Sequence, residues 1–150
     1  MNLPEKEDAS DTLFLESFAI KGSDFISAGR VSIAVKNLLK GAGLPADILR
    51  RAAIVAYEAE MNVVMYGGDG ACSLHLSPKM IRLVMKDQGP GISDLDLAMQ
   101  EGWSTATPQM REMGFGAGMG LPNIKKNSDR LKIDTAPGRG TTLQAEIDIP

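Results

Sequence analysis

The order of the elements expected along the chain is the feature that most constrains its fold. Apolar residues repeat at strand spacing in some segments and at helix spacing in others. These patterns predict strands over 12–20, 71–76, 80–86, 131–135 and 141–149, and helices over 24–40, 45–63 and 119–130. Two helices after the first strand and one helix before the last two strands favour an α/β (α+β) two-layer sandwich. Its sheet is expected to be mixed but mostly antiparallel, with helices on one face.

The two early helices are predicted from their start signals and apolar stripes. Asp24 can cap the first helix, whose inward side chains are expected to be Ile26, Val31, Ala34 and Leu38 or Leu39. Pro45 suits the first turn of the second helix. Its stripe is Ile48, Ala52, Val55, Ala59 and Val63. Glu60 lies off this stripe and is interpreted as an ordinary surface acid.

Length and charge narrow the function classes. A chain of 150 residues has the size of one domain, so we expect residues 1–11 to be a disordered or frayed tail and residues 12–150 to form that domain. A net charge of -3 without dense Lys/Arg clusters argues against a nucleic-acid partner. No apolar run predicts a signal peptide or a membrane span, so a cytoplasmic location is expected. Cys72 and His75 are too few for a disulfide or a zinc site.

The first candidate site signal lies on the second helix. Glu58 and Asn62 are four residues apart, so their side chains lie one above the other. Asn62 falls in line with the apolar stripe, where a carboxylate and an amide need a partner. A hydrated Mg²⁺ with phosphates would satisfy them, because Mg²⁺ favours oxygen ligands. Alone, the pair is also compatible with a solvated helix edge.

The second signal directly follows a predicted strand. Asp87 continues the inward row of Ile81, Leu83 and Met85, so a carboxylate points toward the core side. Such a carboxylate needs a donor, and the exocyclic amine of adenine is one. Gly89 and Gly91 let the chain turn close to a ligand. An ordinary turn rich in Asp, Gly and Pro is the plain alternative.

The third signal is the glycine-rich run over 114–121, at the end of a long irregular segment. Alternate glycines free backbone N–H groups to surround an anion ahead of the next helix. The run follows a loop rather than a strand, which excludes a dinucleotide-binding fingerprint, and no Gly-Lys-Ser/Thr closes it as in a P-loop. A flexible hinge remains the alternative. The irregular segment from Gln88 to about Gly116 is long enough to predict a functional loop.

The fourth signal follows the turn over 137–140. Thr141 shares a face with Leu143, Ala145 and Ile147, so a hydroxyl extends an inward apolar row. A threonine at the start of a strand after a β-turn explains this position equally well. Each of the four signals is weak by itself, and their combination in this order is specific.

The order Glu-x-x-x-Asn, Asp-x-Gly-x-Gly, Gly-x-Gly-x-Gly and Gly-Thr resembles the motifs of the GHKL ATPases, over about residues 12–150. That superfamily includes gyrase, Hsp90, MutL and histidine kinases. The chain is most similar to the bacterial anti-sigma-factor serine kinases, and among them to the stressosome switch kinases. The residues that carry this likeness are 58–62, 87–92, 99–105 and 116–122. The resemblance implies the Bergerat ATP-binding fold and a serine/threonine protein kinase that uses ATP and Mg²⁺.

The resemblance also implies a role for each motif residue. Glu58 would be the general base and Asn62 the Mg²⁺ ligand. Asp87 would accept from the adenine amine with support from Thr141, in a pocket shaped by Gly91 and with Gly89 also among the ATP-binding residues. The residues that would cradle the phosphates are Gly116, Ala117, Gly118, Met119, Gly120 and Leu121. Residues 93–113 would form the ATP lid, which is longer here than in the stressosome kinases through residues 106–113.

The implied partner is a STAS-domain anti-anti-sigma or stressosome-type protein, phosphorylated on Ser or Thr. A sigma factor or a phosphatase is a further candidate, and a homodimer is a family-level expectation. Two alternatives stay open: an anti-sigma factor proper, and a non-catalytic ATP-dependent protein-binding module. An isolated histidine-kinase catalytic domain is disfavoured, because no phosphoacceptor-histidine helix is predicted and His75 lies on a predicted strand.

Overall fold

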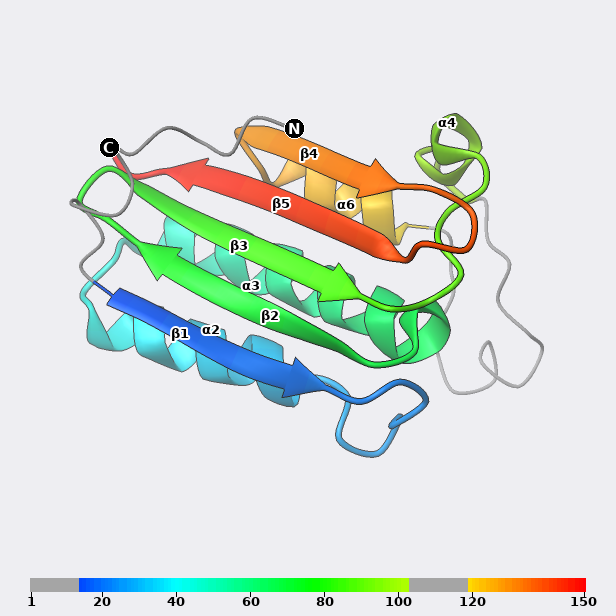
Figure 1. The fold of residues 1–150 in the computed structure, drawn as a ribbon. Helices are drawn as coiled ribbons and strands as arrows, with labels where there is room; N and C mark the ends of the chain where they lie inside the picture. Colours follow the sequence, from blue (N-terminus) through cyan, green and yellow to red (C-terminus); the bar gives the residue numbers. More distant parts are fainter. Residues whose placement is uncertain (1–13, 103–118) are drawn as a thin grey trace.

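A computed structural model of the chain describes residues 14–102 and 119–150, which form one sheet with helices packed against it (Figure 1). The strands are β1 (Phe14–Ile20), β2 (Gly70–Leu76), β3 (Met80–Asp87), β4 (Arg130–Thr135) and β5 (Thr141–Asp148). Their order in the sheet is β1-β2-β3-β5-β4. Every neighbouring pair is antiparallel, so the predicted sandwich is confirmed with an antiparallel rather than a mixed sheet.

Three helices cover one face of this sheet, as the sequence predicted (Figure 1). They are α2 (Arg30–Gly41), α3 (Ala46–Asn62) and α6 (Gly120–Lys126). A π-helical turn, Val63–Gly67, extends α3, and α4 (Leu95–Ala98) is a short helix that begins after Asp94. The predicted α3 stripe is confirmed, and it packs on buried strand residues that include Cys72, Leu74, Ile81, Leu83, Leu143, Ala145 and Ile147. The core therefore lies between the helix layer and the sheet.

The first helix was expected to begin at Asp24, and that prediction is wrong. Ser23 and Gly29 both have positive φ, 63° and 98°, which interrupts a right-handed helix before Arg30. The Asp24 carboxylate accepts from the Ser27 backbone N–H at 3.2 Å and so forms a turn. Ile26 is fully exposed. The buried residues of α2 are Val31, Ser32, Val35 and Leu39, whereas Ala34 is half-buried and Leu38 exposed.

The third helix is shorter than its prediction over 119–130. It ends at Lys126, because the side chains of Asn127 and Ser128 donate to the Asn123 and Ile124 carbonyls at 2.9 and 2.7 Å. These bonds satisfy carbonyls that another helical turn would have used. Arg130 then already belongs to β4.

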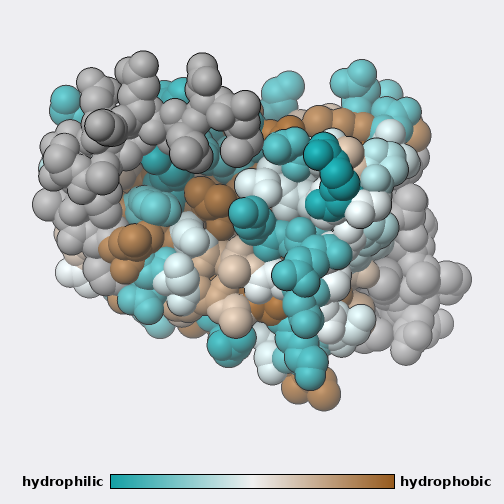
Figure 2. All heavy atoms as spheres, viewed as in Figure 1, coloured by the Kyte–Doolittle hydropathy of each residue, from teal (hydrophilic) through white to brown (hydrophobic). Residues whose placement is uncertain are grey.

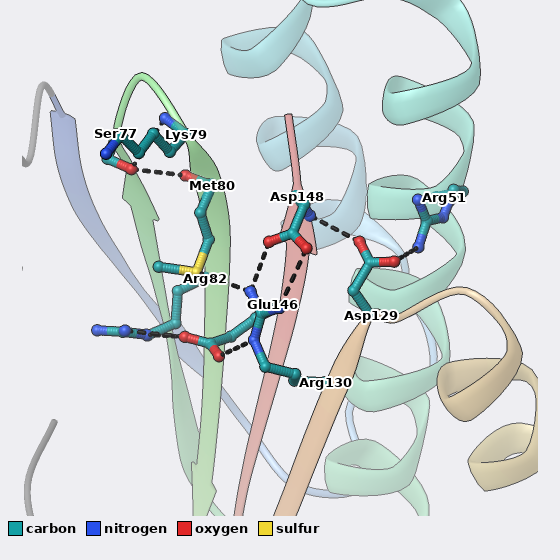
Figure 3. A network of polar contacts seen from close by, with 9 residues as sticks. All are labelled: Arg51, Ser77, Lys79, Met80, Arg82, Asp129, Arg130, Glu146 and Asp148. Atoms are coloured by element: carbon teal, nitrogen blue, oxygen red, sulfur yellow. Dashed lines mark hydrogen bonds and ion pairs between the residues drawn. The ribbon is translucent and has the colours of Figure 1, made fainter. Parts of the chain in front are cut away.

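The sheet face that the helices leave uncovered is largely polar, and Figure 2 shows hydrophilic residues across much of its described part. At the end where β3 begins and β5 finishes, charged side chains join three strands (Figure 3). Glu146 accepts from Arg82 Nε at 2.9 Å and from Arg130 Nε at 2.8 Å. On the helix side, Arg51 of α3 pairs with Asp129 at 3.2 Å. This network links β3, β4, β5 and α3 at one end of the sandwich, and the predicted site residues lie at the other end.

None of the helices in the described part of the chain is long and apolar enough to cross a membrane.

Candidate functional site

The two polar residues predicted on the second helix meet α6. Glu58 and Asn62 lie in α3, and both are half-buried. A Cβ built on Gly120 would lie 3.2 Å from Glu58 Oε2 and 3.3 Å from Asn62 Oδ1. Because Gly120 carries no side chain, it leaves room directly beside these two oxygens. The i,i+4 pair therefore faces the element that follows the glycine-rich run, and not open solvent.

The pKa of the Glu58 carboxyl is shifted. Burial raises the pKa of its carboxyl above that of an ordinary glutamate, and a hydrogen bond with the Asn123 side chain partly opposes the rise. Asn123 lies three residues after Gly120 and so returns to the same side of α6. Asn123 was missed from the sequence, although this helical spacing from Gly120 could have found it. A carboxylate with a raised pKa next to an open glycine is suited to taking up a proton.

The predicted inward carboxylate lies at the end of β3. Asp87 Oδ1 accepts from the backbone N–H groups of Gly89 at 3.0 Å and Thr141 at 3.2 Å. Asp87 and Thr141 are register partners across β3 and β5. Both hydrogen bonds that the described residues make to the Asp87 side chain therefore reach the same oxygen, Oδ1. The carboxylate is thus held by the backbone on one oxygen, and its other oxygen can accept from a ligand.

Two glycines bring the loop after β3 against the β4–β5 turn. Gly91 has φ +77°, and a Cβ there would lie 2.1 Å from the Ala136 carbonyl oxygen. Gly140 has φ +72°, and a Cβ there would lie 2.2 Å from the Asp87 carbonyl oxygen. Only glycine fits both the backbone conformation and these approaches. These two glycines therefore allow the loop after β3 and the β4–β5 turn to pack closely, and a role of Gly91 in shaping a base pocket stays a prediction.

A second threonine accompanies Thr141. Thr135 is its register partner in β4, and the two hydroxyl oxygens are 2.9 Å apart. Thr135 Oγ1 also accepts from the Ile92 backbone N–H at 2.8 Å and donates to the Gly140 carbonyl at 3.3 Å. Thr135 was not predicted from the sequence. The short turn that joins the two strands was a usable signal, since it sets Thr135 opposite Thr141.

Part of the predicted phosphate-binding run can be located. Met119 caps α6, Gly120 begins it and Leu121 is buried in the core. Gly116, Ala117 and Gly118 lie outside the described residues, as does the predicted lid after residue 102. The described part of the predicted lid contains α4, which Asp94 caps by accepting from the Leu97 N–H at 3.0 Å.

The donor set around Asn62 suits a magnesium ion better than a transition metal. The described residues contain no group of three or more His, Cys, Asp or Glu side chains that could hold a metal. The site offers the Asn62 amide oxygen beside the space at Gly120. Mg²⁺ is commonly held by one or two protein oxygens together with phosphates and water, so these residues fit it.

Glu60 is not the surface acid that the sequence suggested. It is only 2% exposed, and its carboxylate reaches across to the start of α2. Oε2 accepts from the Gly29 and Val31 N–H groups at 3.2 and 3.1 Å, and Oε1 accepts from the Ser32 N–H at 2.9 Å. Glu60 therefore caps α2 from a neighbouring helix, a contact between segments that helical periodicity alone does not reveal.

Comparison with known proteins identifies a family and relatives of this chain. Residues 31–150 match the family model described as histidine kinase-, DNA gyrase B- and HSP90-like ATPase. The serine/threonine-protein kinase RsbT of Bacillus subtilis is 29% identical over 114 residues, which are 73% of this chain and 80% of that protein. An anti-sigma F factor of Bacillus velezensis is 30% identical over 104 residues, which are 65% of this chain and 68% of that protein.

A solved structure supports the fold. The mycobacterial sensor histidine kinase MprB superposes with a TM-score of 0.50 and 19% identity, over 67% of this chain and 72% of the other. At this identity the likeness concerns the fold alone.

Proposed function

The chain belongs to the histidine kinase-, DNA gyrase B- and HSP90-like ATPase family, and from this we propose that it is an ATP-dependent serine/threonine protein kinase of a bacterial partner-switching pathway. The observation that carries the proposal is the meeting of Glu58 and Asn62 at Gly120, on the helix side of a sheet that ends in Asp87 and Thr141. One cluster suits phosphoryl transfer and the other suits a purine base.

The base would bind at the end of β3. Asp87 would accept from the 6-amino group of adenine through the oxygen that its backbone bonds leave available, with Thr141 beside it. Gly89 and Gly91 would let the loop pass close to the base. The backbone of residues 116–121 would surround the phosphates, since glycines leave N–H groups accessible to anions.

Asn62 would hold Mg²⁺, which neutralises developing charge on the phosphates when it is bound. Glu58 would act on the partner protein. The hydroxyl oxygen of a Ser or Thr attacks the γ-phosphorus while its O–H bond breaks and the proton passes to a Glu58 carboxylate oxygen. The bond from the γ-phosphorus to the β,γ-bridging oxygen breaks, and ADP leaves. The raised pKa of Glu58 suits this proton transfer.

The acceptor would be a STAS-domain antagonist, and the reaction would take place in the cytoplasm. The similarity to RsbT and to anti-sigma F factors supports this class of partner. The test is transfer of radiolabelled γ-phosphate from ATP to candidate STAS proteins. We expect Glu58→Gln to lower the transfer rate about a hundredfold or more, because general-base catalysis is worth at least that much, with ATP binding retained. Transfer at the wild-type rate by Glu58→Gln would refute the assignment.

A second candidate function follows from the anti-sigma F relatives. A chain of this kind would bind a sigma factor directly and phosphorylate the sigma factor's antagonist. The similarity to the anti-sigma F factor of B. velezensis, at 30% identity, favours this alternative. Copurification of a sigma factor with the tagged chain in the presence of ATP would support it, and recovery of STAS proteins alone would favour the switch kinase.

A further inference from the structure

Thr135 occupies a position from which it can control the hydroxyl of Thr141. Asp87, Thr141 and Thr135 are consecutive register partners across β3, β5 and β4, so they form one row at the end of the sheet. All three are half-buried. The row contains one carboxylate and two hydroxyl groups, and the proposed base-binding residues Asp87 and Thr141 are two of its three members.

Either hydroxyl could donate in the contact between Thr135 and Thr141, but all three contacts of the Thr135 hydroxyl can be hydrogen bonds at once in only one arrangement. Thr135 has one hydroxyl proton, which it donates to the Gly140 carbonyl at 3.3 Å. Its oxygen accepts from the Ile92 N–H at 2.8 Å. The 2.9 Å contact with Thr141 therefore needs the Thr141 proton. Thr135 is then fully bonded, and Thr141 has only lone pairs left for a ligand.

We propose that Thr135 is a positioning residue for base selectivity: it takes the Thr141 proton and so makes Thr141 a hydrogen-bond acceptor toward the purine. This inference rests on the ATP-binding part of the proposed function. Asp87 is an acceptor as well, so the row presents acceptors only. Adenine carries a donor amine at position 6, whereas hypoxanthine and guanine carry an acceptor oxygen there. The row therefore selects a 6-amino purine over a 6-oxo purine.

The same hydroxyl also holds the loop after β3. Ile92 follows Gly91, and its N–H bond to Thr135 connects the loop after β3 with β4. Gly138 N–H donates to the Pro90 carbonyl at 2.7 Å and adds a second link, between the same loop and the β4–β5 turn. Loss of the Thr135 hydroxyl would leave this second link in place, so the loop need not detach when Thr135 is changed.

The test measures ATP and ITP affinity by calorimetry with magnesium, for the wild-type protein and for Thr135→Val. Wild type is expected to prefer ATP. The valine variant keeps the side-chain shape but releases the Thr141 proton, which can then be donated to the 6-oxo group of ITP. We expect the ratio of ATP to ITP affinity to fall about tenfold, the size of one hydrogen bond changed from favourable to mismatched.

Two variants serve as controls. Thr135→Ser keeps the hydroxyl and should restore the wild-type ratio. Thr142→Val removes a threonine hydroxyl from the opposite face of β5 and should also leave the ratio unchanged. If Thr135→Val weakens both nucleotides equally, or neither, then Thr135 has only a structural role and the proposal is wrong.

Loss of folding and failure of the kinase proposal can each be distinguished from failure of the selectivity proposal. Circular dichroism checks whether Thr135→Val is folded. If it is not, Thr141→Val decides, because it removes the acceptor and keeps the bonds of Thr135 to Ile92 and Gly140, and an unchanged ratio would overturn the proposal. A wild-type chain that binds ATP but phosphorylates no protein would refute the kinase and leave the selectivity test intact. A chain that binds neither nucleotide would refute both.

Discussion

The pKa of the Glu58 carboxyl depends on two opposing effects, burial and a hydrogen bond with the Asn123 side chain. Burial raises its pKa, and the hydrogen bond with Asn123 lowers it. A general base works only when it is deprotonated, so the rate of phosphoryl transfer should fall as the pH drops through this pKa. Since the net shift is upward, the fall should begin at a higher pH than an ordinary glutamate would give.

Asn123→Ala tests this balance. The variant removes the effect that lowers the pKa, so we expect the acid-side midpoint of the pH profile of kcat/KM to move to higher pH. Asn127→Ala is the matched control, because the Asn127 side chain donates to the Asn123 carbonyl and not to Glu58. A midpoint that stays in place, or moves to lower pH, would contradict the assigned bond.

At the scale of elements, α2 depends on a cap supplied by α3. Three N–H groups at the start of α2 donate to the buried Glu60 carboxylate. Glu60→Gln preserves the volume but replaces one acceptor oxygen with a donor that faces N–H groups. We expect the free energy of unfolding to fall by about 2 kcal/mol, because a buried charged hydrogen bond is lost and a donor is left mismatched.

Urea denaturation measures this change. Glu101→Gln is the matched control, since its carboxylate pairs with Lys126 in an exposed position and such pairs contribute about 0–1 kcal/mol. If Glu60→Gln is no less stable than Glu101→Gln, the cap is not a significant source of stability.

Periodicity predicted most elements correctly, and it failed where partners come from another segment. The α3 stripe and the strand rows repeat regularly, so local sequence was sufficient to find them. The start of α2 depends on Glu60, thirty residues away from Arg30, and on the positive φ of Gly29. The end of α6 depends on side chains that bond to the preceding carbonyls. Neither the start of α2 nor the end of α6 is therefore marked by a periodic repeat in the sequence.

Several residues of the candidate site could be proposed from local sequence in the same way. Asn62, Asp87 and Thr141 are polar residues in line with apolar rows, and Glu58 lies one helical turn before Asn62, so each could be singled out from its own segment. Thr135 and Asn123 were missed: the turn after β4 and the spacing from Gly120 were usable signals, but the roles of these residues depend on a register partner and on a neighbouring helix. Their contacts are seen only once the segments are packed together.

In the whole molecule, one end of the sandwich carries a charged network and the other end carries the candidate site. At one end Arg82, Arg130 and Glu146 join β3, β4 and β5, and Arg51 ties α3 to the chain before β4 (Figure 3). At the other end the same elements carry Asn62 on α3, Asp87 on β3 and Thr141 on β5. A fixed far end lets the strands and α3 present these residues in a constant relation, which a preorganised site requires.

The central claim is that this end of the molecule binds magnesium-ATP through Asp87. Calorimetry of the wild-type chain and of Asp87→Asn tests it most directly. We expect the wild type to bind, and the variant to bind roughly ten- to a hundredfold more weakly, because an amide substitutes for a charged acceptor that the backbone holds in place. No binding by the wild type, or equal affinity in the two proteins, would contradict the account.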